Sequence, residues 1–307
     1  MKPIFLKFQD DCALLDAVGA TGVHNRCVTG HKNDIIAKYR LYRAAVNKPA
    51  VMKIRTEIPE NLEKALAAKY TEGRDGRGAF SYLGQWAKKP GSVSCPYCGR
   101  KGLGTIDHYL PQDHFAVFSV YSPNMIPACQ ACQLKKGSRY SCESRRPIHP
   151  LLDRFGIAQE VIIRTRIHES GELDESSFTF SSQPTHPKLP RRIRKREAML
   201  LKKHYRFFDM AKRDEVVNDC VLELKGLRSS LYEAQVPAGE PTAVRQWMVD
   251  VLARIEANQD EDSTPFLREA LLRGFLTDEH AMIRFAQSHV PVAKFTRSSK
   301  ISMLKKR

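Results

Sequence analysis

The chain has no apolar run close to the roughly 20 residues that a membrane-spanning helix needs. Residues 1–18, MKPIFLKFQDDCALLDAV, carry acidic residues at the place where a signal peptide has its apolar core. We therefore expect a cytoplasmic protein that does not act at a membrane. The apolar fraction of 42% and the charged fraction of 27% are those of an ordinary globular chain, and they exclude an intrinsically disordered one.

Acidic residues are scarce relative to basic ones. Lys and Arg total 50 against 34 Asp and Glu, which gives a formal net charge of +16. Residues 190–213 carry ten basic residues and two acids, and residues 294–307 carry six basic residues and no acid. From charge alone, so local an excess predicts a polyanionic partner, nucleic acid first and an anionic membrane second. A solvated helix face with a solubilising tail is the alternative. The expected nucleic-acid contacts in the first segment are Arg191, Arg192, Arg194 and Lys195.

Four of the eight cysteines form two CxxC pairs, Cys95-Pro-Tyr-Cys98 and Cys129-Gln-Ala-Cys132. Two such turns in a cytosolic-type chain favour a tetrahedral Zn²⁺ site over disulfides. Four thiolates leave the metal no open position, so we expect this zinc to be structural and to replace hydrophobic core. The remaining cysteines have no partner at metal-ligand spacing and are interpreted as ordinary thiols: Cys12, Cys27, Cys142 and Cys220.

The segment between the two pairs carries residues suited to catalysis. It contains Asp107-His108, then Pro111, and Asn124 ahead of the second pair. A short strand ending at His108, an irregular loop and a helix after the second pair are the expected order. Histidine can act as a general base near neutral pH, and a carboxylate is the oxygen ligand that a hard divalent ion prefers. Adjacent strand residues point to opposite sides, so Asp107 and His108 can face different groups.

The order CxxC, DHxxP, Asn, CxxC and a basic KKG resembles the HNH endonucleases over residues 93–140. The resemblance implies a zinc-held ββα-metal fold that hydrolyses phosphodiester bonds in DNA with one Mg²⁺ or Mn²⁺. It implies that Asp107 ligates this ion, that His108 is the general base, and that Asn124 orients the base or braces the loop. Gln133 stands where the family usually has Asn or His as the second metal ligand. Its longer side chain leaves open whether the site is active.

Other residues near this motif have competing interpretations. Lys135 and Lys136 are expected phosphate contacts at the start of the helix, with solvated surface as the alternative. Asp113-His114 is a second DH pair, which we place in the loop. We favour His108 over His114 as the general base. His149 lies in an HPxxD stretch similar to one that follows the nuclease in some HNH proteins, but a chain-reversal role is simpler.

The expected fold class is α+β and mostly helical, with a small zinc-stabilised ββα-metal (HNH) module between helical flanks. The regions are a helical part over 1–90, the module over 91–147, and a C-terminal part over 148–307 with a hairpin, long helices and a basic tail. Apolar spacing predicts helices, a hairpin of 159–168 with 176–181, and a proline-rich linker over 182–190. The predicted helices lie near 11–18, 32–46, 59–70, 191–233, 241–258 and 265–288.

These features favour a metal-dependent HNH endonuclease that cleaves DNA, of the kind found in bacterial or phage defence and restriction. One alternative is a zinc-knuckle protein that binds nucleic acid with a weak or inactive centre, because of Gln133. Another is a nuclease subunit that is silent until a partner such as an ATPase activates it.

Overall fold

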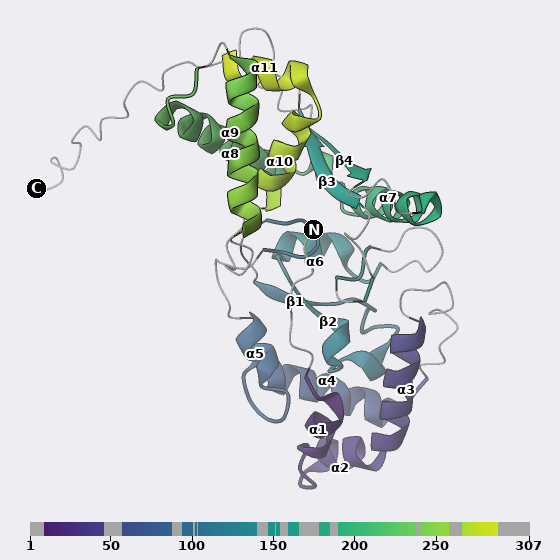
Figure 1. The fold of residues 1–307 in the computed structure, drawn as a ribbon. Helices are drawn as coiled ribbons and strands as arrows, with labels where there is room; N and C mark the ends of the chain where they lie inside the picture. Colours follow the sequence, from purple (N-terminus) through teal and green to yellow (C-terminus); the bar gives the residue numbers. More distant parts are fainter. Residues whose placement is uncertain are drawn as a thin grey trace, which may run out of the picture.

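The computed structural model describes most of the chain, and its secondary structure is mainly helical (Figure 1). The described helices include none with the length and apolar character needed to cross a membrane. Cys142, residues 185–189 and the basic tail at 294–307 fall outside the described part of the chain. The described residues are 9–45, 57–87, 94–100, 102, 104–139, 147–150, 152–153, 159–165, 178–184, 190–237, 240–257 and 266–287.

The N-terminal part is helical, as the apolar spacing predicts. The helix near 11–18 begins where the Asp10 carboxylate accepts hydrogen bonds from the Cys12 and Ala13 amides, both at 3.1 Å. The helix over 23–30 was not predicted, because it is short and largely polar, with Val28 as its buried residue. The helices are α1 (Asp11–Asp16), α2 (Val23–Gly30), α3 (Lys32–Ala45), α4 (Glu60–Arg74) and α5 (Tyr82–Ala87).

The middle part consists of β1 (Thr105–His108), the short 3₁₀ turns η2 (Ala116–Phe118) and η3 (Ser122–Asn124), β2 (Met125–Ala128) and α6 (Gln130–Lys136). β1 pairs antiparallel with β2, with Thr105 opposite Ala128 and His108 opposite Met125. The order is therefore two strands and a helix. The order taken from the residues omitted β2, because its Met-Ile-Pro-Ala sequence contains a proline that argues against a strand, although the resemblance implied a second strand.

The C-terminal part combines a hairpin with helices (Figure 1). β3 pairs antiparallel with β4, and the hairpin packs between α7 and α10. β4 extends to Pro184, into the segment expected to be a linker. The elements are β3 (Gln159–Arg164), β4 (Thr179–Pro184), α7 (Arg191–Phe207), the 3₁₀ turn η5 (Met210–Lys212), α8 (Asp214–Glu233), α9 (Pro241–Ala257), α10 (Phe266–Leu276) and α11 (Glu279–Gln287).

Two of the predicted helices are each broken in two. The prediction of one helix over 191–233 is wrong, because Asp209 adopts a left-handed conformation with φ 48° between α7 and α8. The prediction of one helix over 265–288 is wrong as well. Asp278 there caps α11 by accepting a hydrogen bond from the Ala281 amide at 3.1 Å. Apolar spacing continued across both breaks, and so it gave no sign of them.

The buried apolar residues of all three parts belong to one continuous core. The parts lie one above another, with the N-terminal helices at the bottom and the C-terminal helices at the top (Figure 1). At the lower junction, the rings of Tyr39 and Tyr121 stack with centroids 3.9 Å apart. The Asp11 carboxylate also accepts hydrogen bonds from the Ser122 amide and hydroxyl, at 2.8 and 2.9 Å. Burial raises the pKa of Asp11 to about 6 despite these bonds.

The contact between α10 and β3 has no room for a side chain at Gly274. A Cβ atom there would lie 2.0 Å from the carbonyl oxygen of Ile163, and a backbone atom cannot move aside. We expect Gly274→Ala to destabilise the protein by about 2–4 kcal/mol, measured by urea unfolding. Gly226→Ala in α8 is the matched control. Its Cβ would meet the end of the flexible Arg268 side chain at 3.0 Å, so stability should change by less than about 1 kcal/mol. Equal unfolding midpoints for the two variants would contradict this account.

Candidate metal centre and catalytic residues

The two CxxC pairs meet, as predicted, and their four buried Sγ atoms lie within 4.8 Å of one another. The Sγ atoms of Cys98 and Cys129 are 3.7 Å apart. A tetrahedral zinc with Zn–S bonds of about 2.3 Å requires sulfur atoms about 3.8 Å apart. This four-cysteine cluster (Cys95, Cys98, Cys129 and Cys132) therefore fits a closed, structural Zn²⁺ site.

Local structure brings each pair of thiols to the same side of its turn. In the first pair, the Gly99 amide donates to the Cys95 carbonyl at 2.7 Å, and Gly99 takes the positive φ of 74° that this tight turn needs. In the second pair, Cys129 is the residue before α6 and Cys132 lies in its first turn. The neighbouring thiols, Cys132 foremost, lower the pKa of Cys129, which favours the thiolate that a metal binds.

Arg213 is a part of the metal centre that sequence reasoning missed. Its Nη1 donates a hydrogen bond to the Cys132 Sγ at 3.1 Å, and its side chain is buried at the start of α8. Burial lowers the pKa of Arg213, but the charge of Cys132 raises it, and the net shift is upward. The sequence placed Arg213 within a basic segment, and its distance of 81 residues from Cys132 gave no sign of the contact.

The C-terminal part docks on the first CxxC turn through buried contacts. The His204 Nδ1 accepts a hydrogen bond from the Ile148 amide at 3.0 Å, so its Nε2 carries the proton and donates to the Tyr97 carbonyl at 2.6 Å. Burial lowers the pKa of His204 to about 4, which keeps the ring neutral. The Phe208 ring packs on Tyr97 with centroids 4.9 Å apart. The sequence assigned no role to His204.

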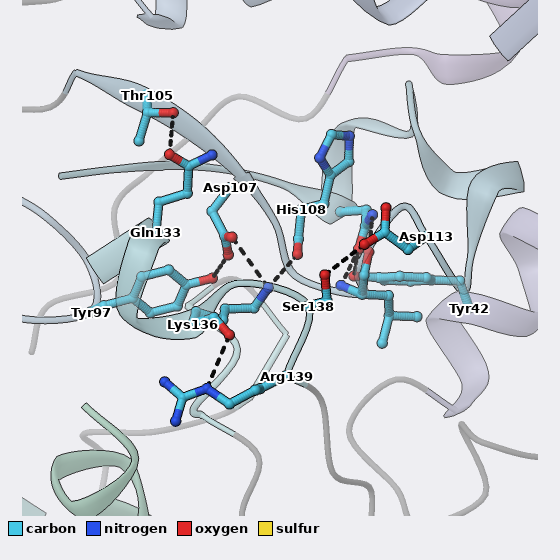
Figure 2. A network of polar contacts seen from close by, with 12 residues as sticks. Tyr42, Tyr97, Thr105, Asp107, His108, Asp113, Gln133, Lys136, Ser138 and Arg139 are labelled. Carbon is cyan, nitrogen blue, oxygen red and sulfur yellow. Dashed lines mark hydrogen bonds and ion pairs between the residues drawn. The ribbon is translucent and has the colours of Figure 1, made fainter. Parts of the chain in front are cut away.

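Asp107 lies inside the protein, between the first CxxC turn and α6 (Figure 2). The Tyr97 hydroxyl donates to Oδ2 at 2.7 Å, and the Lys136 ammonium donates to Oδ1 at 3.2 Å. Burial raises the pKa of Asp107 to about 6, although Lys136 and Tyr97 both lower it. The carboxylate thus remains ionised at neutral pH, and each oxygen accepts a hydrogen bond from the protein.

The His108 ring points away from Asp107, as the strand geometry predicts (Figure 2). Its Nε2 lies 3.1 Å from the Ser119 carbonyl oxygen, which can only accept a hydrogen bond. Nε2 therefore carries the proton, and Nδ1 carries the lone pair that a general base needs. Burial lowers the pKa of His108 to about 4, so the ring is neutral at pH 7. Tyr70 of α4 packs against this ring with centroids 4.6 Å apart.

Asn124 braces the loop between β1 and β2, which is one of the two roles implied for it. The side chain is fully buried, and its Oδ1 accepts from the Leu110 amide at 2.8 Å and the Tyr42 hydroxyl at 3.0 Å. Its Nδ2 donates to the carbonyls of Leu110 and Phe118, both at 3.2 Å. These bonds tie the end of β1 to η2 and to α3.

His149 joins the same buried network. Its Nδ1 accepts a hydrogen bond from the Leu152 amide at 3.2 Å, so its Nε2 donates to the Tyr42 hydroxyl at 3.1 Å. The His149 amide donates to the Asp153 carboxylate at 2.7 Å. The histidine and aspartate of the HPxxD stretch thus fix a turn and anchor it on α3, which agrees with the chain-reversal interpretation.

The residues expected to bind the catalytic ion are occupied by protein groups. The Thr105 hydroxyl donates to the Gln133 Oε1 at 2.9 Å, and the Lys136 ammonium lies beside Asp107 (Figure 2). A divalent cation at Asp107 would lie against this ammonium and be repelled by it. As they are arranged here, Asp107 and Gln133 do not fit Mg²⁺ or Mn²⁺.

The basic residues expected to contact DNA divide into two groups. The prediction for Lys136 is wrong, because its side chain is fully buried in an ion pair. Lys135 is partly exposed and pairs with Asp209 at 2.5 Å. On α7, three of the expected residues are exposed and Arg194 is half-buried. The exposed three are Arg191, Arg192 and Lys195.

The second DH pair lies on an exposed part of the loop, as expected. His114 is exposed, and Asp113 accepts a hydrogen bond from the Ser138 hydroxyl at 2.6 Å. This pair is therefore not part of the buried strand that carries Asp107 and His108.

Comparison with known proteins gives limited information. No family model matches the chain, and no solved structure matches it. Protein ea31 of Escherichia phage lambda is 40% identical over 105 residues, a match that covers 32% of this chain and 35% of the phage protein. The chain therefore matches about a third of that relative.

Zinc retention is expected to depend on Arg213. Metal analysis of the purified protein should find about one zinc per chain. Arg213→Leu removes the charged donor at Cys132 and should release zinc to a chelator about tenfold faster, followed with a colorimetric zinc indicator. Lys212→Leu, at the exposed neighbouring position in η5, is the control and should release zinc at the wild-type rate. Equal rates for both variants would show that Arg213 does not support the metal.

Proposed function

We propose that this protein is an HNH-type endonuclease that hydrolyses phosphodiester bonds in DNA. The observation that carries the proposal is the environment of His108. The ring is neutral, its tautomer is fixed by the Ser119 carbonyl, and it sits at the end of β1, whose partner strand β2 leads into the second CxxC pair. The antiparallel pair β1 and β2 followed by α6 agrees with the ββα arrangement that the resemblance implies.

In the proposed reaction, Nδ1 of His108 takes a proton from a water molecule, and the water oxygen attacks the phosphorus. The bond between phosphorus and the 3′ oxygen then breaks, and the leaving 3′ oxygen takes a proton from solvent. The Ser119 carbonyl accepts a hydrogen bond from Nε2–H, which holds the ring in place and stabilises the imidazolium that forms when Nδ1 is protonated. The resemblance assigns Mg²⁺ or Mn²⁺ to such a site, where the ion would stabilise negative charge. Asp107 and Gln133 do not fit the ion as arranged, so no step here depends on it.

DNA binding is assigned to the basic side of α7. Eight of its residues are Lys or Arg, and Glu197, its one acid, is buried. Of the aromatic residues of this segment, Tyr205 and Phe208 are buried and do not add to the binding surface. An exposed basic helix next to the catalytic module could hold the phosphate backbone in place.

A second candidate function is nucleic-acid binding without cleavage. The observations that favour it are the hydrogen bond that occupies Gln133 and the ion pair that occupies Asp107. A nuclease subunit activated by a partner such as an ATPase, in a defence system, is a third proposal. It agrees with the partial burial of His108 under Tyr70, which a partner could relieve.

Cleavage of plasmid DNA tests the first candidate. The purified protein is incubated with supercoiled plasmid and Mg²⁺ or Mn²⁺, and nicked and linear products are followed on gels. His108→Ala should lower the rate by about 10²-fold or more, because it removes the base. His114→Ala, in the exposed second DH pair, should cleave at the wild-type rate. If His108→Ala cleaves normally, the assignment of the base is wrong. If the wild type never cleaves but still binds DNA, the binding function is supported instead.

The salt dependence of DNA binding tests α7. Replacing Arg191, Arg192 and Lys195 with Gln should weaken binding and reduce the slope of log affinity against log salt by up to about 2.7. Fluorescence anisotropy with a labelled duplex measures both quantities. Arg245→Gln, at an exposed site on α9, is the control for loss of positive charge elsewhere. An unchanged slope in the triple variant would identify the basic face as solvated surface.

A further inference from the structure

Lys136 is a lysine whose charged end lies inside the protein. Its side chain is fully buried, and its ammonium donates to the Asp107 Oδ1 at 3.2 Å and to the His108 carbonyl oxygen at 2.5 Å. A buried ammonium needs a counter-ion, and here the counter-ion is Asp107. The ammonium therefore sits between the two residues of the DH pair, on the carboxylate side of β1 (Figure 2).

The chain places this ammonium through helix α6. Lys136 is the last residue of α6, and Gly137 ends the helix with a φ of 50° while its amide donates to the Gln133 carbonyl at 2.8 Å. The long side chain then reaches across to β1, which packs against α6. Lys135, one position earlier, points elsewhere and pairs with Asp209 on the partly exposed surface. Their positions along α6 thus place Lys136 inside the protein and Lys135 at its surface.

The remaining oxygen of the carboxylate is also engaged, because the Tyr97 hydroxyl donates to Oδ2 at 2.7 Å. Tyr97 lies within the first CxxC turn and is itself fully buried. Asp107 is thus held from the metal centre on one side and from α6 on the other. A small divalent ion would have to displace one of these donors to reach the carboxylate.

We infer that Lys136 is the resident cation of Asp107. Its ammonium takes the position beside the carboxylate that the HNH resemblance gives to a divalent ion, and Asp107 binds no such ion while Lys136 is in place. Lys136 is a positioning residue in this account. It fixes Asp107 and the His108 main chain, and therefore the end of β1 from which the His108 ring projects.

This inference rests on the proposed nuclease function, from which it takes the assignment of Asp107 to a catalytic site. Its test measures metal binding and not cleavage, so the two proposals can fail separately. The zinc-loaded, full-length protein is titrated with Mn²⁺, and free Mn²⁺ is followed by electron paramagnetic resonance. The variants are Asp107→Asn, Lys136→Met and the double variant. Zinc content and circular dichroism establish that each variant is folded.

The wild type and Asp107→Asn should take up Mn²⁺ alike, because the wild-type carboxylate is not available to it. Lys136→Met should bind one Mn²⁺ at least about tenfold more tightly, and the double variant should lose this gain. The inference is overturned if the wild type has a Mn²⁺ site that Asp107→Asn abolishes. It is also overturned if a folded Lys136→Met gains no site.

A measurement on the wild type alone covers the case in which Lys136→Met does not fold. Lysines are methylated reductively with and without Mn²⁺, and the modified positions are mapped by mass spectrometry. Lys135 should react under both conditions, and Lys136 should be protected under both. If Mn²⁺ makes Lys136 reactive, the ion displaces the ammonium and the inference is wrong.

Discussion

The four-cysteine cluster is the constraint on which the rest of the structure depends. It joins two turns separated by thirty residues, and everything between them, including the strand of Asp107 and His108, is held from both ends. A metal bound to four thiolates would add its binding energy to that of the hydrophobic core which this segment shares with the rest of the chain. The cluster also reaches outward, because Arg213 at the start of α8 donates to one of its sulfur atoms. The C-terminal helices therefore contact the same centre.

The interior around this centre contains several buried polar groups. Asn124, the pair of Asp107 and Lys136, and the histidines His149 and His204 are all buried and hydrogen-bonded. Each would cost several kcal/mol if its hydrogen-bond partners were lost. A buried polar group without a partner has lost its hydrogen bonds to water, and no protein group replaces them. A buried network of this kind selects one arrangement of loops and strands. That rigidity is what the general base proposed at His108 requires, since its tautomer and direction must both be fixed.

Local features of the structure were predictable from particular residues. The start of α4 just after Pro59 follows from the preference of proline for the beginning of a helix, and the meeting of the two CxxC pairs follows from the geometry of zinc ligands. The placing of Tyr205 and Phe208 in the core follows from their spacing. The break at Asp209 was not predictable, because no side-chain cap marks it, whereas the N-cap at Asp278 is a local signal that apolar spacing alone does not reveal. Lys136 was not predictable either, since only the register of α6 on β1 separates it from Lys135.

The sequence by itself determined which chemical groups are present and in what local arrangement. These are four thiols at metal-binding spacing, a DH pair on a strand, and a basic segment near residue 191. Those properties depend on a few neighbouring residues, and so local spacing reveals them. Only the tertiary structure decided which charged side chains are exposed and which are buried against a group of opposite charge. Arg213 and Lys136 both belong to basic stretches of the sequence, yet one neutralises a cysteine and the other an aspartate inside the protein. The physical reason is that a charge can be buried only where another part of the chain supplies its counter-charge, and that meeting is set by packing over long range.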